Sequence, residues 1–133
     1  MQDYYELQCR THFSFLEGAS HPEEMVRGAI AQGLPGIAVT DRNGVYGLPK
    51  AYDAQKEAPS FRLISGSDVS LCDFPAVTLL AESKSGYGWM CRMLSQAHAQ
   101  KDKTNAYLRF QELLEYASHP RGRELTYFVN VPL

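Results

Sequence analysis

The sequence predicts an α/β fold with a mainly parallel sheet, because stretches typical of strands alternate with stretches typical of helices. Residues 3–9 have the pattern of a strand, and residues 20–33 have the pattern of an amphipathic helix. Residues 36–40 form a short apolar run, which is typical of a parallel strand buried on both faces. Together these stretches predict a βαβ unit with a right-handed crossover.

The helix expected over residues 20–33 has signals at both ends. Ser20 and Glu23 have the spacing of a capping box, and Pro22 suits the first turn. Gly33 suits the left-handed conformation in which many helices end. Apolar side chains recur at helical spacing, which places on the buried face Met25, Val26, Ala29 and Ile30.

The middle of the chain continues the alternation of helix and strand. A second helix is expected over residues 49–58, where Pro49 either begins the helix or kinks it. Residues 61–82 have the pattern of a hairpin made of two strands. Gly66, in the first of these strands, is expected to mark a bend or a bulge.

The C-terminal part is expected to add two helices and a strand. The first helix covers residues 85–100, with an inward face made of Met90, Met93, Leu94 and Ala97. A polar loop over residues 101–107 follows, and we expect it to be mobile. The second helix covers residues 108–117, with core positions at Phe110, Leu113, Leu114 and Ala117. Residues 125–131 form an apolar strand.

Length and composition limit the classes of protein that fit. The 133 residues suggest a single domain over residues 1–133, and 44% hydrophobic and 21% charged residues are ordinary for a soluble globular protein. A net charge of -2 argues against direct binding of nucleic acid, which needs concentrated positive charge. No stretch approaches the roughly 20 apolar residues of a membrane span. The three cysteines form no CxxC pair, as expected for a reduced cytoplasmic protein.

Polar side chains gather where three of the expected strands end. In α/β folds, binding and catalytic residues lie at the C-terminal ends of the strands. The candidates at these three ends are Gln8, Arg10, His12, Thr40, Asp41, Arg42, Asn43, Ser67 and Asp68. We expect them to converge on one mouth of the fold.

Three kinds of site are compatible with these residues. As a metal site the group is poor, because only His12, Asp41 and Asp68 are good ligands and two arginines stand among them. As an anion site it is better, because Arg10 and Arg42 could hold a phosphate. In the third alternative, an arginine pairs with one of the two carboxylates and holds the strand ends together. Arg42→Ala is then expected to leave a carboxylate unpaired.

Several blocks of the sequence resemble one known family. They are, in chain order, FSFLEGASHPEEMVRGAIAQGLPGIAVTDRNGVYGL (residues 13–48), ISGSDVSL (residues 64–71) and VTLLAESKSGYGWMCRMLSQA (residues 77–97). In this order they resemble the N-terminal half of a PHP (polymerase and histidinol phosphatase) domain, as in the bacterial DNA polymerase III alpha subunit. The resemblance is closest to the error-prone DNA polymerase branch, and it covers nearly the whole chain.

The resemblance implies part of a distorted (β/α)7 PHP barrel. In active members this barrel carries a two- or three-metal phosphoesterase site that uses zinc, manganese or iron. The His-x-His pair that ends the family's first strand is matched here by Gln8 and Arg10. The Thr-Asp-His of the second strand is matched by residues 40–42, with Arg42 in place of the histidine, and the carboxylate of the third strand is matched by Asp68. Three of these four ligand positions lack a ligand, so we expect no metal cofactor.

The function that follows from the resemblance is a non-catalytic PHP-like module of DNA replication or DNA repair. It would be a pseudoenzyme with a structural or protein-interaction role. His12 lies beyond the matched pair, at a position that is not a family ligand. Two alternatives stay open: a metal-dependent phosphoesterase or proofreading nuclease with a divergent site, and a phosphate- or nucleotide-binding domain.

The matched blocks correspond to only part of a PHP barrel. A partial barrel leaves sheet edges and an apolar face exposed unless something covers them. We therefore expect self-association, or a partner such as the remainder of a DNA polymerase or another replication or repair protein. The chain would then be either a piece of a long polymerase or a truncated relative of one.

Overall fold

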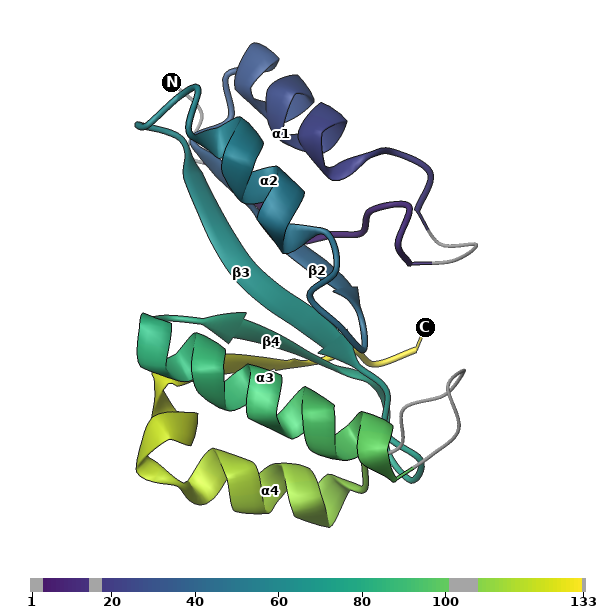
Figure 1. Ribbon diagram of the computed structural model, residues 1–133. Helices are drawn as coiled ribbons and strands as arrows, with labels where there is room; N and C mark the ends of the chain where they lie inside the picture. The colour runs from purple at the N-terminus through teal and green to yellow at the C-terminus, as the bar shows by residue number, and fades with distance from the viewer. Residues whose placement is uncertain (1–3, 15–17, 101–107, 133) are drawn as a thin grey trace.

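The computed structural model describes residues 4–14, 18–100 and 108–132 (Figure 1). The elements in chain order are β1 (Tyr5–Cys9), α1 (Pro22–Ala31), β2 (Gly36–Arg42), α2 (Leu48–Gln55), β3 (Arg62–Val69), β4 (Val77–Ala81), α3 (Lys84–Ala99), α4 (Phe110–Ser118), the 3-10 helix η1 (Pro120–Glu124) and β5 (Leu125–Val129). This order confirms the α/β fold. The loop expected over residues 101–107 lies outside the described residues. Among the described helices, none is long and apolar enough to cross a membrane.

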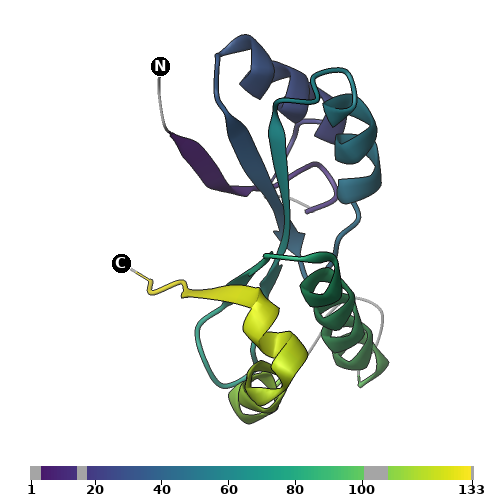
Figure 2. The same ribbon diagram turned by 90° about the vertical axis from the view of Figure 1, so that its left-hand side faces the viewer.

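The strands form one curled sheet in the order β1-β2-β3-β4-β5. β1, β2 and β3 run parallel to one another, as predicted for the βαβ part of the sequence. β3, β4 and β5 are antiparallel neighbours, so the hairpin expected over residues 61–82 turns the parallel sheet into a mixed one. Figure 2 shows the resulting half-barrel, with the helices on one side and with β1 and β5 reaching toward the other side.

The N-terminal end of α1 differs from the sequence prediction. The helix begins at Pro22, and His21, not Ser20, is the N-cap residue. The His21 backbone N–H donates a hydrogen bond to the Glu24 carboxylate at 3.1 Å, so the capping box is shifted by one residue. The reason is that the Ser20 carbonyl accepts a hydrogen bond from the His12 backbone N–H at 2.9 Å. This bond ties Ser20 to the loop after β1.

Other positions of Gly and Pro agree with the sequence signals, with one exception. Gly33 has a φ of +77°, the left-handed conformation expected after α1. Pro49 lies in the first turn of α2 and therefore begins that helix. The exception is Gly66, which marks no bulge against β2, because the register of β3 with β2 continues through it; the pairing of β3 with β4 begins at this residue.

Two clusters of buried side chains lie between the helices and the sheet. The first lies between α1, α2 and β2, with Val26 fully buried in it. The second lies between α3, α4 and strands β3 to β5. It includes the predicted inward face of α3, made of Met90, Met93, Leu94 and Ala97. Val45 and Tyr87 pack against both clusters and so mark their junction.

Helix α4 buries less of its surface than its sequence pattern predicts. Leu113 is 3% exposed, but Leu114, which was also expected in the core, is 42% exposed. Phe110 stacks on Phe74 with ring centroids 4.0 Å apart and is only partly buried. The helix lies at the margin of the fold, packed mainly against η1, so a narrow stripe of it meets other elements (Figure 1).

This difference between neighbouring leucines gives a stability prediction. Leu113→Ala is expected to lower the free energy of unfolding by about 2–4 kcal/mol, because it leaves a cavity in the second cluster. Leu114→Ala is expected to change it by less than about 0.5 kcal/mol, because the side chain already contacts solvent. Urea unfolding followed by circular dichroism measures both values. Equal losses in the two variants would show that α4 buries both residues.

Candidate functional site

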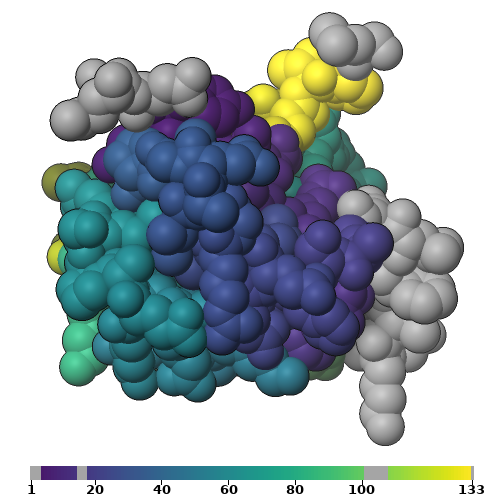
Figure 3. Space-filling model, turned by 90° about the horizontal axis from the view of Figure 1, so that it is seen from above, coloured from purple at the N-terminus to yellow at the C-terminus, as the bar shows by residue number. Residues whose placement is uncertain are grey.

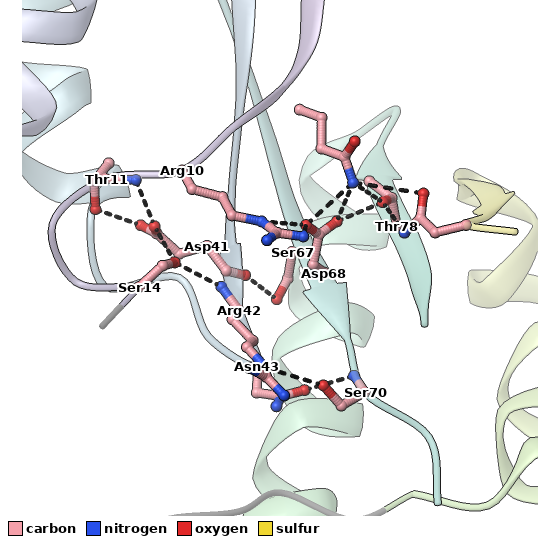
Figure 4. Close-up of polar contacts among 12 residues, drawn as sticks. Arg10, Thr11, Ser14, Asp41, Arg42, Asn43, Ser67, Asp68, Ser70 and Thr78 are labelled. Carbon is pink, nitrogen blue, oxygen red and sulfur yellow. Dashed lines mark hydrogen bonds and ion pairs between the residues drawn. The ribbon is translucent and has the colours of Figure 1, made fainter. Parts of the chain in front are cut away.

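The ends of the strands hold two separate networks of polar side chains instead of one (Figure 4). One network surrounds the Asp68 carboxylate and the other surrounds the Asp41 carboxylate, and the two residues are 2% and 1% exposed. Asp68 is in register with Arg42, whereas Asp41 is in register with Ser67. Because successive side chains of a strand point to opposite faces, the two carboxylates lie on opposite faces of the sheet. The prediction that the polar side chains of the three strand ends converge on one site is therefore wrong.

The Asp68 carboxylate binds the Arg10 guanidinium. Arg10 Nε and Nη2 both donate to Asp68 Oδ2, at 2.8 Å and 2.6 Å. The Thr78 hydroxyl donates to the other carboxylate oxygen, Oδ1. The arginine side chain is 30% exposed, so the ion pair is buried on one side and open to solvent on the other. This pair joins the chain just after β1 to β3.

Two amide side chains extend this network across the sheet. The Gln8 Nε2 atom lies 3.3 Å and 3.4 Å from the two oxygens of Asp68 and 3.3 Å from Thr78 Oγ1. Asn130 Nδ2 donates to Thr78 Oγ1 at 2.9 Å. The network thus links β1, β3, β4 and the residue that follows β5.

The Asp41 carboxylate holds the loop that follows β1. It accepts hydrogen bonds from the Thr11 backbone N–H and the Thr11 hydroxyl, both at 2.8 Å, and from the Ser14 hydroxyl at 2.7 Å. The Ser14 hydroxyl oxygen in turn accepts from the Arg42 backbone N–H at 3.0 Å. Gly47 allows this arrangement, because a Cβ atom there would lie 2.7 Å from Asp41 Oδ2.

Arg42 contributes less to these networks than the sequence suggested. Its Nε donates to the Ser70 hydroxyl at 3.3 Å, and the side chain is exposed. Both buried carboxylates take their described donors from other residues. The expectation that Arg42→Ala leaves Asp41 or Asp68 unpaired is therefore corrected: Arg10 is the arginine that pairs with Asp68.

The remaining candidates have separate surroundings. The His12 ring lies against the rings of Phe13 and His21, each at a centroid distance of 4.3 Å, and not in either carboxylate network. Ser67 Oγ donates to the Asp41 carbonyl at 3.0 Å, which couples β3 to β2. The Asn43 side-chain oxygen accepts from the Ser70 backbone N–H at 2.8 Å.

Four residues of the networks were not among the sequence candidates: Thr11, Ser14, Thr78 and Asn130. Thr78 lies at the beginning of β4, and Asn130 follows β5. An antiparallel strand brings its N-terminal end to the edge where parallel strands bring their C-terminal ends. The hairpin predicted over residues 61–82 was the signal that could have identified Thr78.

The groups around Asp68 do not suit a divalent metal ion. At the four positions matched to family ligands, only Asp68 is a metal ligand by type, and its oxygens already accept from Arg10 and Thr78. A divalent cation about 4 Å from a guanidinium would be repelled by roughly 8 kcal/mol near a protein surface. Among the described residues, no group of three or more His, Cys, Asp or Glu side chains could hold a metal ion.

Cys9 stands between Gln8 and Arg10 but is a poor nucleophile and a poor metal ligand. Burial raises the pKa of the Cys9 thiol to about 11, and the Glu6 carboxylate adds to the effect. The thiol is therefore protonated near neutral pH, whereas nucleophilic attack and metal binding require the thiolate.

The chain matches the PHP domain family over residues 6–125. It is 39% identical over 114 residues to an error-prone DNA polymerase of Rhodopirellula baltica, in a match that covers 86% of this chain and 10% of the relative. It is 42% identical over 108 residues to an error-prone DNA polymerase of Anaeromyxobacter dehalogenans, covering 77% of this chain and 10% of the relative. The chain thus spans about a tenth of the length of these curated relatives.

Solved structures share the fold. A protein of Bifidobacterium adolescentis assigned as a metal-dependent phosphoesterase has a TM-score of 0.54 at 20% identity, with 87% of this chain and 44% of that chain covered. An amidohydrolase of Chromobacterium violaceum, solved with sulfate and without metal, has a TM-score of 0.55 at 19% identity, with 88% and 45% covered. The half-barrel fold is consistent with the family match over residues 6–125. The chain therefore belongs to the PHP domain family.

Proposed function

We propose that this chain is a non-catalytic PHP module of the error-prone DNA polymerase type, in which an ion pair stands where active members hold metal. The observation that carries the proposal is the pair of hydrogen bonds, 2.8 Å and 2.6 Å long, from the Arg10 guanidinium to Asp68. A cation of the protein itself neutralises the one carboxylate that matches a family ligand. Such a site has no open position for a metal-bound water and so lacks the nucleophile of a metal phosphoesterase.

The role of such a module is to support a larger assembly. β1 and β5 are the edges of the described sheet. Beside these edges Leu7 is 37% exposed, Phe128 is 44% exposed and Val129 is 50% exposed. Figure 3 shows the N-terminal strand and the C-terminal residues on the same side of the molecule. We infer that this side is covered by a second copy, by the remainder of a DNA polymerase, or by another replication or repair protein in the cytoplasm.

Metal analysis tests the loss of the metal site. After purification without chelator and incubation with zinc or manganese, the wild-type protein is expected to retain far less than one metal ion per chain. The triple variant Gln8→His, Arg10→His, Arg42→His is expected to retain more, because it supplies three imidazoles around Asp68 and removes both guanidinium groups. Inductively coupled plasma mass spectrometry of the desalted proteins measures the difference.

A comparison of the wild-type protein with Asp68→Asn can overturn the proposal. Stoichiometric zinc or manganese that disappears in Asp68→Asn would show a functioning site, and hydrolysis of a phosphate ester that needs this metal would show an enzyme. Circular dichroism of the triple variant confirms that it folds. A matched control is Arg27→His, which adds an imidazole at an exposed ion pair away from the site and is expected to retain no metal.

A further inference from the structure

Basic side chains surround Trp89 on the side of α3 that packs against η1 (Figure 1). The guanidinium carbons of Arg92 and Arg121 lie 5.7 Å and 5.2 Å from the centre of the Trp89 ring. The His119 ring stacks on the same tryptophan, with ring centroids 4.1 Å apart. We call these four residues the Trp89 cluster. Because both guanidinium groups contact one ring, two positive charges lie close to each other.

The fold holds the Arg121 guanidinium in place. Its Nε and Nη2 donate to the hydroxyl and carbonyl oxygens of Ser85, at 3.3 Å and 3.2 Å. Gly88 leaves room for this group, because a Cβ atom there would lie 2.8 Å from Arg121 Nη2. The ring beside it is fixed as well, since Trp89 Nε1 donates to the Tyr116 carbonyl at 3.0 Å. The arginine is therefore ordered before a ligand binds, which reduces the entropy lost on binding.

The two arginine charges are not neutralised within the described part of the chain. Neither Arg92 nor Arg121 forms an ion pair with a described carboxylate. Glu124 lies near Arg121, but hydrogen bonds from Ser83 and Ser85 are the main cause that lowers the pKa of this carboxyl, and the charge of Arg121 adds least. The Ser83 hydroxyl donates to Glu124 at 2.8 Å. An anion from outside would therefore meet two charges that the chain does not balance itself.

His119 supplies a further hydrogen-bond donor. Its Nδ1 accepts from the Arg121 backbone N–H at 3.1 Å. In the neutral imidazole the proton is then on Nε2, because a nitrogen that accepts a hydrogen bond carries no proton. The residue is exposed, so the Nε2–H group can donate to an anion bound by the two arginines.

The surroundings of the Trp89 cluster favour nucleic acid over an acidic protein as its ligand. A protein interface has an apolar centre, but the large apolar side chains exposed among the described residues all lie outside α3 and η1. Interfaces with nucleic acid are more polar and more positively charged, and a guanidinium group binds phosphate bidentately. Since His119 already stacks on Trp89, we expect contacts to phosphates and no stacking of bases on this ring.

We propose that the Trp89 cluster binds the phosphodiester backbone of a single DNA strand without regard to sequence. Arg92 and Arg121 pair with phosphates of the strand, and His119 Nε2 donates to one of them. The net charge of -2 argues against an extensive nucleic-acid surface, so the site makes only a few phosphate contacts and its affinity depends strongly on salt. The proposal is independent of whether the ion pair at Arg10 has replaced a metal site.

Fluorescence anisotropy with a labelled oligothymidylate of about 12 nucleotides tests the proposal. The wild-type protein is expected to bind it at about 50 mM salt and to lose affinity as the salt concentration rises. Arg92→Gln and Arg121→Gln should each lower the affinity about fivefold and reduce the slope of log K against log salt by about 0.7. Trp89 is the one tryptophan of the chain, so its fluorescence should change when unlabelled oligonucleotide is added.

Control variants and competitors separate this site from general attraction of charge. Lys50→Gln removes an exposed cation on α2 and is expected to change the affinity by less than about twofold. Circular dichroism checks the folding of Arg121→Gln, whose guanidinium binds Ser85, whereas the described contact of Arg92 is to the Trp89 ring. Absence of binding, equal losses in Arg92→Gln and Lys50→Gln, equal affinity for polyglutamate of the same length, or equal competition by inorganic phosphate would each overturn the proposal.

Discussion

Replacing Arg10 with methionine is expected to lower the free energy of unfolding by about 2–4 kcal/mol. The change removes both charged donors from Asp68 Oδ2 and leaves a carboxylate that is 2% exposed without a cation. The expected loss is somewhat smaller than for a fully buried pair, because Arg10 is 30% exposed and the Thr78 hydroxyl still donates to Asp68. Urea unfolding at neutral pH measures it.

Two further variants show whether the loss comes from the ion pair. Arg27→Met breaks another arginine–carboxylate pair, to Glu57, whose side chains are 56% and 59% exposed, and it is expected to leave the urea concentration at the unfolding midpoint almost unchanged. Asp68→Asn on the Arg10→Met background should recover part of the loss, because the buried group is then neutral. If Arg10→Met and Arg27→Met unfold at the same urea concentration, the Arg10–Asp68 pair contributes no more to stability than an exposed ion pair, and Asp68 does not need the cation of Arg10.

The order of helices and strands could be predicted because its signals are local. The spacing of the apolar residues in α3 predicts which face of that helix is buried, and the apolar run at residues 36–40 predicts β2. Helix boundaries were less predictable, since the start of α1 depends on a hydrogen bond between Ser20 and the distant His12. Leu114 shows the same limit: helical spacing identifies a candidate face, but the neighbours of α4 determine how wide the buried stripe is.

The sequence predicted which residues form the site better than it predicted which of their side chains form hydrogen bonds and ion pairs with one another. The ends of the three parallel strands did identify Arg10, Asp41 and Asp68. Which arginine meets which carboxylate depends on strand register and on the alternation of faces, because Arg42 and Asp68 share a face yet Arg10 forms the described ion pair. The sequence does not place Asn130 beside Thr78, since that contact requires β5 to pair with β4.

The second large effect is expected at Asp41, on the opposite face. Asp41→Ala is expected to lower the free energy of unfolding by about 3–5 kcal/mol, because the Thr11 N–H and the Thr11 and Ser14 hydroxyls lose their acceptor. Asp41→Asn should cost less, because one oxygen is kept and the Thr11 hydroxyl can rotate to accept from the new amide. Hydrogen exchange should become faster at the Thr11 amide in both variants, more so in Asp41→Ala.

Asp53→Ala is the matched control, since it removes an aspartate that is 73% exposed and pairs only with Lys56 among the described contacts. It is expected to change stability by less than about 1 kcal/mol and to leave exchange at Thr11 unchanged. The comparison distinguishes two roles for Asp41. A carboxylate kept for metal chemistry would be dispensable for folding, and its removal would leave the loop after β1 protected. A carboxylate that anchors this loop would be required in a PHP module without any metal, because the same loop carries Arg10 into contact with Asp68.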